Sequence, residues 1–399
     1  MEREIHNIIL FGAGASVDAG IPAMANFVDK IWELSVRGKV GEQTIAPEDR
    51  RILQEANAVR LDLERYHSRA SFDDRNLEDL LSLISFGAMR SGSGAKEKYE
   101  KLVQAIAVTI ELCCRFKHWS DSPSELDERG CQHVYNTFWL TLLQDHLNNL
   151  PAIITFNYDL VLERTLWEAY HRTNEMSGGG CPRSVALRYL ANQRDMAFKR
   201  TPYQYQQRLR DGGPSETKEG WCARVVESGK SDVDTPYLKL HGSLNWIDYK
   251  TGANVEKEGW HPTKAVLKPL ILPPVFNKLQ SQDVSSVWTK ALEVLRQAKH
   301  LIIVGYSLPR TDIYMQYFVK AAVGPNSNLS RVFVFNPDLW NDSEAANLMK
   351  ARYSDCFSAQ FKERIDFHPL PNRAQGRPGS MEHFVRALNS RDEPLLFKP

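Results

Sequence analysis

The stretch from Ile8 to Pro22 most constrains how this chain can fold, because an apolar run changes abruptly into small residues. Residues 8–11 have the composition of a buried strand, and Gly12 and Gly14 follow directly. Glycine lets the backbone turn tightly and lets a phosphate approach closely, while the amides that open the next helix attract an anion. The stretch therefore predicts a strand, a glycine turn and a helix that together bind a dinucleotide.

The spacing of these glycines differs from the usual dinucleotide fingerprint. The pattern GxGxxG would require a third glycine where Val17 stands, and the next glycine is Gly20. A plain dehydrogenase is therefore disfavoured. The alternative at this point is an ordinary buried first strand followed by a glycine turn.

Length and composition restrict the class of protein. The chain has 399 residues, 42% of them hydrophobic, and a formal net charge of +1. This charge gives no overall drive toward nucleic acid or an anionic membrane. The first residues lack the apolar core of a signal peptide, and no apolar run approaches the length of a bilayer span, so we expect a cytoplasmic protein.

The six cysteines contain no CxxC pair. A zinc ribbon therefore has no support, and we expect no metal. Reduced structural cysteines are the simplest interpretation of this pattern.

The rest of the chain divides into a core with insertions. Helical spacing dominates residues 35–149, which we interpret as a large helical insertion. Residues 1–34 and 150–340 then form an α/β core with a parallel sheet, and the C-terminal segment 341–399 packs on it.

A polar, glycine-rich insertion is expected at about 171–234. It interleaves basic with aromatic residues, which could follow a nucleic-acid backbone. The favoured alternative is a solvated face or an oligomer contact, because the net charge is balanced.

Polar or small residues follow four more apolar runs, at the point where each predicted strand ends. The strand ending at residue 156 is followed by Asn157 and Asp159, and the strand ending at 240 by His241. The strands ending at 304 and 335 are followed by a glycine turn and by Asn336. Because parallel strands bind ligands at their carboxyl ends, these residues are site candidates.

Each candidate also has a structural reading. Asn157 and Asp159 could cap the next helix, and a lone histidine is usually structural. His241 is better placed than most, since its ordinary pKa lets it accept a proton near neutral pH.

Four motifs, in content and order, resemble the sirtuin family. They are Gly12–Ser16 with Gly20–Pro22, Thr155–Asp159, Leu240–Ser243 and Gly305–Pro309. Within that superfamily, Tyr158, Trp246, the Pro273–Pro274 pair and Tyr306–Pro309 resemble the bacterial NAD-hydrolysing proteins of antiviral defence, such as the sirtuin subunit that works with a HerA-type ATPase. The resemblance implies a Rossmann-like parallel sheet of the sirtuin type with NAD as its ligand.

Two departures from the deacylases of this family are present. The segment Ala23–Ala25 stands where deacylases carry an acidic residue, a phenylalanine and an arginine. The two CxxC pairs of their zinc module are missing as well. Loss of the acyl-lysine activity is the natural inference, and NAD binding can survive it.

The resemblance also implies roles for individual residues. The first turn would hold the pyrophosphate through Gly12, Ala13, Gly14, Ala15 and Ser16. The adenine-side ribose or phosphate would be contacted by Gly305, Tyr306, Ser307 and Asn336. The nicotinamide ribose would be surrounded by Asn157, Asp159 and His241, with Asn157 and His241 as the catalytic pair.

The expected activity is NAD glycohydrolysis, which yields nicotinamide and ADP-ribose. By resemblance, it would deplete NAD after infection, in a homo-oligomer or with a HerA-type ATPase or a short Argonaute. The alternatives are an NAD-dependent deacylase, an ADP-ribosyltransferase, or a non-catalytic NAD-sensing module in a nucleic-acid-associated complex. We expect no membrane partner.

Overall fold

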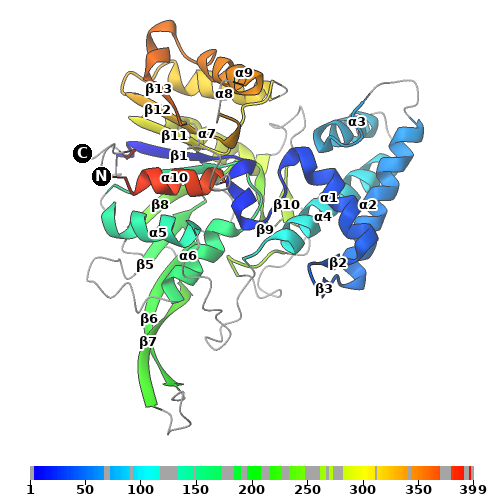
Figure 1. Cartoon of the computed structure of the whole chain (residues 1–399), viewed down its shortest axis with the longest axis horizontal. Coiled ribbons are helices and arrows are strands. Elements are labelled where there is room, and N and C mark those ends of the chain that lie inside the picture. The colour runs from blue at the N-terminus through cyan, green and yellow to red at the C-terminus, as the bar shows by residue number, and fades with distance from the viewer. Residues whose placement is uncertain are drawn as a thin grey trace.

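A computed structural model shows a central sheet with helices on both faces, a separate helical lobe, and a long ribbon that extends from the sheet edge (Figure 1). The residues that it describes are 4–66, 72–89, 93–116, 134–146, 149–171, 184–189, 196–207, 216–226, 233–247, 261–266, 269–272, 282–310, 312–339, 343–368, 379–390 and 395–396.

The main sheet runs in the order β13-β12-β11-β1-β4-β8-β5-β6-β7. All pairs from β13 to β5 are parallel, and β6 and β7 continue the edge antiparallel. This confirms the predicted α/β class. The strands are β1 (Asn7–Phe11), β4 (Ala152–Thr155), β5 (Ser184–Arg188), β6 (Met196–Gln207), β7 (Glu216–Val226), β8 (Val233–Lys239), β11 (His300–Val304), β12 (Arg331–Phe335) and β13 (Ile365–His368).

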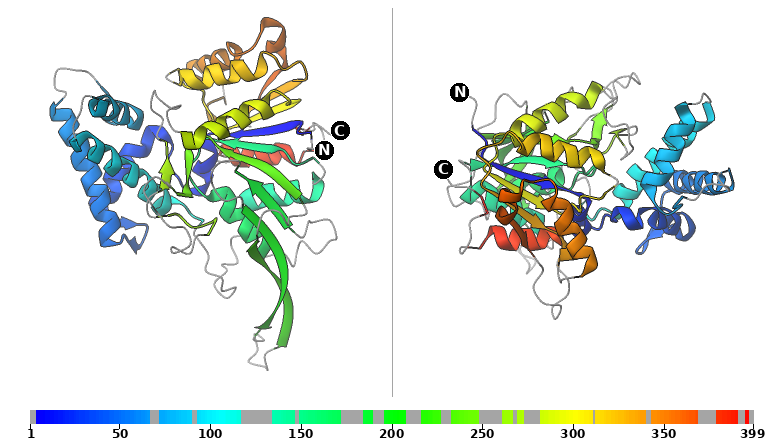
Figure 2. Two further views of the ribbon diagram at one scale, coloured as in Figure 1. Left: turned by 180° about the vertical axis from the view of Figure 1, so that it is seen from behind. Right: turned by 90° about the horizontal axis from the view of Figure 1, so that it is seen from above.

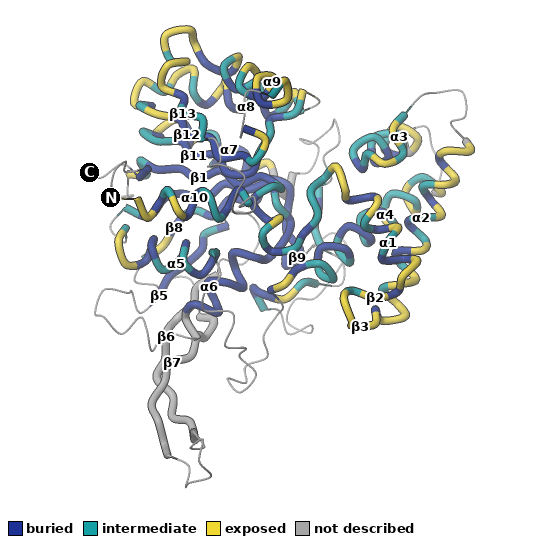
Figure 3. Tube along the Cα trace, in the orientation of Figure 1, coloured by how far each residue is buried: buried dark blue, intermediate teal, exposed yellow. Residues whose placement is uncertain are grey.

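The centre of the sheet is buried from both sides, as Figure 3 shows for β1. Continuous apolar runs suit this position because helices cover both faces of a parallel sheet. In register, Phe11 lies between Val304 of β11 and Thr155 of β4. These strands therefore end side by side, and the turns that follow them meet at one edge.

Helices cover the two faces of the sheet. On one face lie α5 (Val134–Asp145) and α10 (Ser380–Leu388), and on the other α7 (Gln282–Leu295) and α8 (Ile313–Val323) (Figure 2). The ring of Phe11 meets Phe138 of α5 at 5.8 Å and Phe384 of α10 at 6.3 Å between centroids. The C-terminal segment thus joins the core in two ways: α10 packs on β11 and β12, and β13 pairs with β12. Helix α9 (Glu344–Ser354) connects β12 to β13 along the chain.

The helical lobe consists of α1 (Phe27–Arg37), α2 (Pro47–Tyr66), α3 (Leu77–Met89) and α4 (Ser93–Cys113). Helix α4 packs against the other three, and α1 packs against α2. A small hairpin of β2 (Lys39–Val40) and β3 (Gln43–Thr44) joins α1 to α2, where the sequence predicted no strand. Two-residue strands lack an apolar period, so the pattern could not show them.

Two helices lie on the other side of the predicted boundaries. Helix α1 begins within the predicted core segment 1–34, yet it packs on the lobe helices α2 and α4. Helix α5 belongs to the predicted insertion 35–149, yet it packs on α10 and on α6 (Val161–His171) beside the sheet. Helical spacing indicates an apolar face but not the partner that covers it.

The region 171–234, which we expected to be a polar insertion or long loop, contributes strands. β5 joins the parallel sheet beside β8, and β6 and β7 form the long ribbon. Among the basic residues of this region, Arg188 forms an exposed ion pair with Asp234 at 3.2 Å. Arg194, Arg208 and Arg210 lie outside the described residues.

A further short strand lies outside the main sheet. β10 (Pro269–Ile271) pairs antiparallel with β9 (Gly242–Ile247), directly after His241. Gly242 has φ +84°, and a Cβ there would stand 2.1 Å from the carbonyl oxygen of Leu270. The glycine is therefore required for β10 to approach the turn that follows His241.

Candidate functional site

A cavity of about 650 Å³ opens where five strands end, between that edge of the sheet and the helical lobe. The turns after β1, β4, β8, β11 and β12 all contribute to its wall. The predicted site residues that line it are Ala13, Gly14, Ser16, Asn157, Asp159, His241, Gly305, Tyr306, Ser307 and Asn336. The structure therefore brings together residues that lie more than 300 positions apart in the chain.

Gly12 and Ala15 stand behind the wall of the cavity. The amide of Gly12 donates to the carbonyl of Val304 at 2.9 Å, and a Cβ on Gly12 would lie 2.6 Å from that of Tyr306. Ala15 is buried, and its carbonyl accepts a hydrogen bond from the Tyr135 hydroxyl. These two predicted cofactor contacts are thus supports of the first turn, and the ligand-facing surface begins at Ala13 and Gly14.

The glycines of the first turn are required by a second glycine turn. The amide of Gly14 donates to the carbonyl of Gly305 at 2.8 Å. Gly305 has φ +67°, and a Cβ there would stand 2.1 Å from the backbone nitrogen of Ala15. The two turns pack backbone against backbone, which leaves no room for side chains between them.

The helix predicted after the first turn is a 3-10 helix, η1 (Ala13–Ala19). Gly20 ends it at φ +91°, and a Cβ on Gly20 would lie 2.7 Å from the carbonyl of Cys113. Gly20 therefore serves a turn against α4. It does not act as the third glycine of a dinucleotide fingerprint.

A chain of hydrogen bonds links the first turn to the turn after β4. The Nδ2 group of Asn157 donates to the carbonyl of Gly12 at 3.0 Å and to Oγ of Ser16 at 2.8 Å. Ser16 in turn donates to Oδ2 of Asp159 at 2.7 Å, and Oδ1 of Asp159 accepts from the amide of Val161 at 3.0 Å. Asp159 therefore caps α6, which is the structural role considered for it in the sequence analysis, and its carboxylate also orients the hydroxyl of Ser16.

This chain fixes the orientation of the Asn157 amide. The Gly12 carbonyl can only accept a hydrogen bond, so the amide nitrogen of Asn157 must face it. Both hydrogens on that nitrogen are used by Gly12 and Ser16. The carbonyl oxygen of Asn157 is then the atom of this side chain that can accept a hydrogen bond from a ligand or a water.

Aromatic rings form the cavity floor around His241. The ring of Phe156 lies 5.2 Å from His241 and 4.8 Å from Tyr306, and Tyr158 lies 6.2 Å from His241. The hydroxyl of Tyr158 donates to the carbonyl of Leu272 at 2.9 Å. His241 is itself 5% exposed, so it meets a ligand only from within the cavity.

The turns after β11 and β12 form the wall predicted to contact the adenine-side ribose. The amide of Gly305 donates to the carbonyl of Phe335, which holds the two turns together at 2.8 Å. Asn336 uses its Oδ1 to accept from the amide of Asp338 at 3.0 Å. Ser307 also lines the cavity, and its carbonyl accepts from Arg352 at 3.0 Å.

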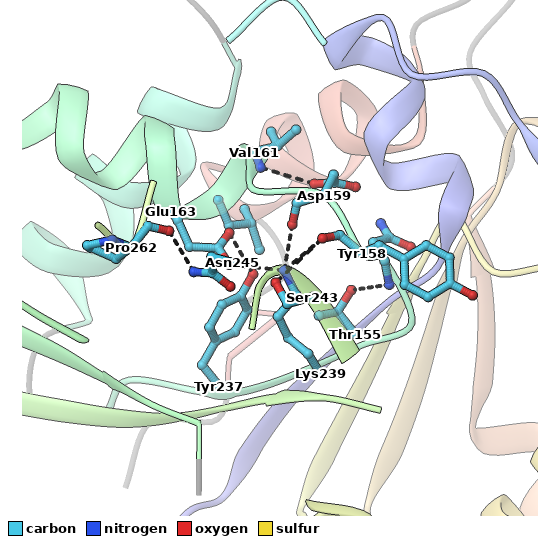
Figure 4. A network of polar contacts seen from close by, with 12 residues as sticks. Thr155, Tyr158, Asp159, Val161, Glu163, Tyr237, Lys239, Ser243, Asn245 and Pro262 are labelled. Carbon is cyan, nitrogen blue, oxygen red and sulfur yellow. Dashed lines mark hydrogen bonds and ion pairs between the residues drawn. The ribbon is translucent and has the colours of Figure 1, made fainter. Parts of the chain in front are cut away.

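A buried ion pair supports the Asn157–Asp159 turn from behind (Figure 4). Nζ of Lys239 donates to Oε1 of Glu163 at 3.0 Å and to the carbonyl of Asp159 at 2.5 Å, and both charged side chains are at most 1% exposed. Oε2 of Glu163 accepts from the hydroxyl of Tyr237 at 3.0 Å. Lys239 thus ties the end of β8 to the turn that carries Asn157.

The helical lobe supplies cavity residues that the sequence did not single out as site residues. They come from the start of α3, from α4 and from the segment after Pro22, and they are Met24, Arg75, Asn76, Glu78, Ile106 and Ile110. Asp312, from the core, also lines the cavity and accepts from the Tyr306 hydroxyl at 2.8 Å, and the sequence analysis did not identify it as a site residue. Asn76 caps the start of α3, where its Oδ1 accepts from the amide of Glu78. Nothing local in the sequence indicates that this helix start lies at a cavity.

Among the described residues, no three histidine, cysteine or acidic side chains gather as metal ligands would. Cys114 and Cys356 are buried and form no disulfide. Burial raises the pKa of Cys114 to about 11 and also raises the pKa of Cys356. No helix in the described part of the chain is long and apolar enough to cross a membrane.

The chain resembles solved structures of Sir2 proteins. One is Sir2 with an inhibitor, 2′-O-acetyl-ADP-ribose and a deacetylated peptide, with 12% identity, 96% of this chain and 92% of that chain covered, and a TM-score of 0.32. Another is Sir2 with a peptide and NAD⁺, with 12% identity, 96% and 91% covered, and a TM-score of 0.33. A point mutant of a Sir2 homologue with ADP-ribose has 12% identity, 96% and 90% covered, and a TM-score of 0.34.

No protein-family model and no curated protein matches the chain. The likeness of this chain to the solved structures has a low sequence identity and a low TM-score. What the cavity can bind and do therefore follows from its own residues.

Proposed function

We propose that this protein is a sirtuin-like NAD glycohydrolase, which cleaves NAD to nicotinamide and ADP-ribose. The observation that carries the proposal is the meeting of Asn157, Ser16, Asp159 and His241 in one cavity with the backbone of two packed glycine turns. Glycine turns at strand ends suit a pyrophosphate. The hydrogen-bonded side chains of Asn157, Ser16 and Asp159, together with His241, suit the ribose next to the pyrophosphate.

The chemistry requires few groups. The C1′–N bond breaks with its electron pair passing to the pyridinium nitrogen, so nicotinamide leaves neutral and needs no general acid. The remaining demands are stabilisation of an oxocarbenium-like sugar and placement of water. The carbonyl oxygen of Asn157, held by Gly12 and Ser16, orients the attacking water. His241 polarises a ribose hydroxyl and accepts the proton that is released.

Hydrolysis is favoured over deacylation by the segment that follows Pro22. Ala23, Met24 and Ala25 line the cavity where deacylases carry an acidic residue, a phenylalanine and an arginine. Small apolar side chains here offer nothing to hold an acylated peptide by hydrogen bonds. They leave a short, mostly apolar wall on which a nicotinamide ring can rest.

The proposal extends to a role in antiviral defence. The enzyme would stay silent until infection and then deplete NAD, as a homo-oligomer or with a HerA-type ATPase or a short Argonaute. The support is the motif resemblance, most of all Tyr158 and the Tyr306–Pro309 segment. Measuring the mass and the NAD turnover of the protein with and without the product of the neighbouring gene tests this extension, and a fully active monomer would argue against it.

The reaction class is tested by product analysis. The purified protein is incubated with NAD alone, with NAD and an acetyl-lysine peptide, and with NAD and an acceptor protein, each with and without the neighbouring gene product. We expect equal amounts of nicotinamide and ADP-ribose from NAD alone. Product that requires the peptide would indicate a deacylase, and a labelled acceptor would indicate a transferase. Tight binding without cleavage in every condition would indicate a sensing module.

A further inference from the structure

Helix α10 begins at the cavity, and the side chain that caps it comes from the other end of the chain. Gly379, at the N-cap position, has no side chain to offer, and it lines the cavity together with Ser380. Instead, the amide of Glu382 in the first turn of α10 donates to Oδ2 of Asp18 at 3.1 Å. A carboxylate suits this place because it satisfies an open amide and faces the positive end of the helix dipole.

Gly379 allows this contact because it has no side chain. A Cβ at this position would stand 1.5 Å from Oδ1 of Asp18 and 2.1 Å from its Cγ. The backbone of Gly379 therefore lies directly against the carboxylate. Any larger residue would have to displace either the carboxylate or the start of α10, and both displacements break the contact.

Asp18 belongs to η1, the short helix that also forms the first turn of the site. Ser16 and Val17 of η1 line the cavity, whereas the carboxylate of Asp18 contacts α10. Ser16 also takes part in the hydrogen-bonded chain with Asn157 and Asp159. The helix η1 is therefore fixed to two walls of the cavity, through Ser16 to the turn after β4 and through Asp18 to α10.

The start of α10 lies beside the wall that is predicted to contact the adenine-side ribose. Helix α10 packs on β11 and β12, and the ring of Phe384 meets that of Phe335, the last residue of β12, at 5.5 Å between centroids. The turn after β12 lines the cavity together with Gly379. The catalytic candidates Asn157 and His241 stand on the turns after β4 and β8, which lie on the other side of β1 in the sheet.

We propose that Asp18 is a positioning residue, which holds the start of α10 against the first turn and so closes the adenosine side of the cavity. This inference rests on the proposed NAD site. When α10 loses its cap, the fraction of molecules that have this wall in place falls, and the apparent affinity for the ligand falls with it. Ligands that contain the adenosine half therefore lose affinity, and ligands that lack it do not.

The test compares ADP-ribose with the carba analogue of nicotinamide mononucleotide, which lacks the adenosine half and resists cleavage. Calorimetry gives the dissociation constants of both ligands for the wild-type protein and for Asp18→Ala, Asp18→Asn and Ser343→Ala. Ser343 is the matched control, because its hydroxyl accepts from the amide of Ala346 at 3.2 Å and caps α9, which does not line the cavity. Each alanine variant therefore loses one helix cap.

We expect Asp18→Ala to bind ADP-ribose about five- to tenfold more weakly than the wild-type protein, with unchanged affinity for the carba analogue. Asp18→Asn can still cap the helix and should stay within about threefold of the wild-type affinity, while Ser343→Ala should equal the wild type. Gly379→Ala should reproduce the loss, because its Cβ breaks the same contact. In the double variant Asp18→Ala/Gly379→Ala, the loss should not exceed that of Asp18→Ala.

The outcomes separate the two proposals. Wild-type affinity for ADP-ribose in Asp18→Ala, an equal loss for both ligands, or the same loss in Ser343→Ala would overturn the role of Asp18 and leave the NAD site standing. Failure of the wild-type protein to bind either ligand would overturn the NAD site itself, and the role of Asp18 with it. If Asp18→Ala does not fold, Gly379→Ala decides the question by the same outcomes.

Discussion

Replacing Lys239 by methionine should destabilise the protein strongly, because it leaves the carboxylate of Glu163 buried without its cation. Both side chains are at most 1% exposed, and Lys239 also donates to the carbonyl of Asp159. Removing one partner of a buried ion pair costs about 3–5 kcal/mol. Tyr237 still donates to Glu163 and offsets part of this loss, so we expect about 3 kcal/mol.

The assay is urea unfolding followed by circular dichroism, with Lys290→Met as the control. Lys290 forms an exposed pair with Glu293 at 3.2 Å, and its loss should cost less than about 0.5 kcal/mol. The double variant Lys239→Met/Glu163→Gln should recover at least about 1 kcal/mol relative to Lys239→Met, since no charge is then stranded. A loss below about 1 kcal/mol in Lys239→Met, or strictly additive effects in the double variant, would refute the reasoning.

Two further predictions concern the glycine turn and a histidine. Gly305→Ala should lower the free energy of unfolding by about 2–4 kcal/mol, because its Cβ would clash with the backbone of Ala15. The control Gly94→Ala, in helix α4 with open space around it, should cause no loss and a gain of up to about 1 kcal/mol. Burial and the charge of His368 lower the pKa of His383 to about 4 from its ordinary 6.5. As the pH falls, His383 is therefore protonated in the unfolded chain before it is protonated in the folded protein, so the free energy of unfolding should fall by about 1–2 kcal/mol between pH 6.5 and 4. The dependence of this free energy on pH should be shallower in His383→Gln. An unchanged slope in that variant would contradict the assignment.

The sequence could predict the strand ends because each parallel strand is a short apolar run stopped by a polar or small residue. The strands His300–Val304 and Arg331–Phe335 end at the residues that the sequence predicts. Since neighbouring parallel strands end at one edge, Asn157 and His241 could be placed together without knowing the strand order.

The rest of the site depends on contacts that no local pattern reports. Glu78 stands in an ordinary helix start, and only the packing of the lobe brings it to the cavity. The requirement for Gly12 and Gly14 comes from Gly305, nearly 300 residues away, and not from a ligand alone. Likewise, β6 and β7 contain few aliphatic residues, so the sequence indicates a polar insertion where the structure has a ribbon.

The most direct test of the proposed activity is the rate of nicotinamide release from NAD by the wild-type protein and by Asn157→Ala, in the presence of whatever partner activates the enzyme. The variant loses the group that orients water, so we predict a rate lower by about 10²–10³-fold, with unchanged affinity for ADP-ribose as the control for folding. Nicotinamide release at the wild-type rate from Asn157→Ala would contradict the proposed mechanism.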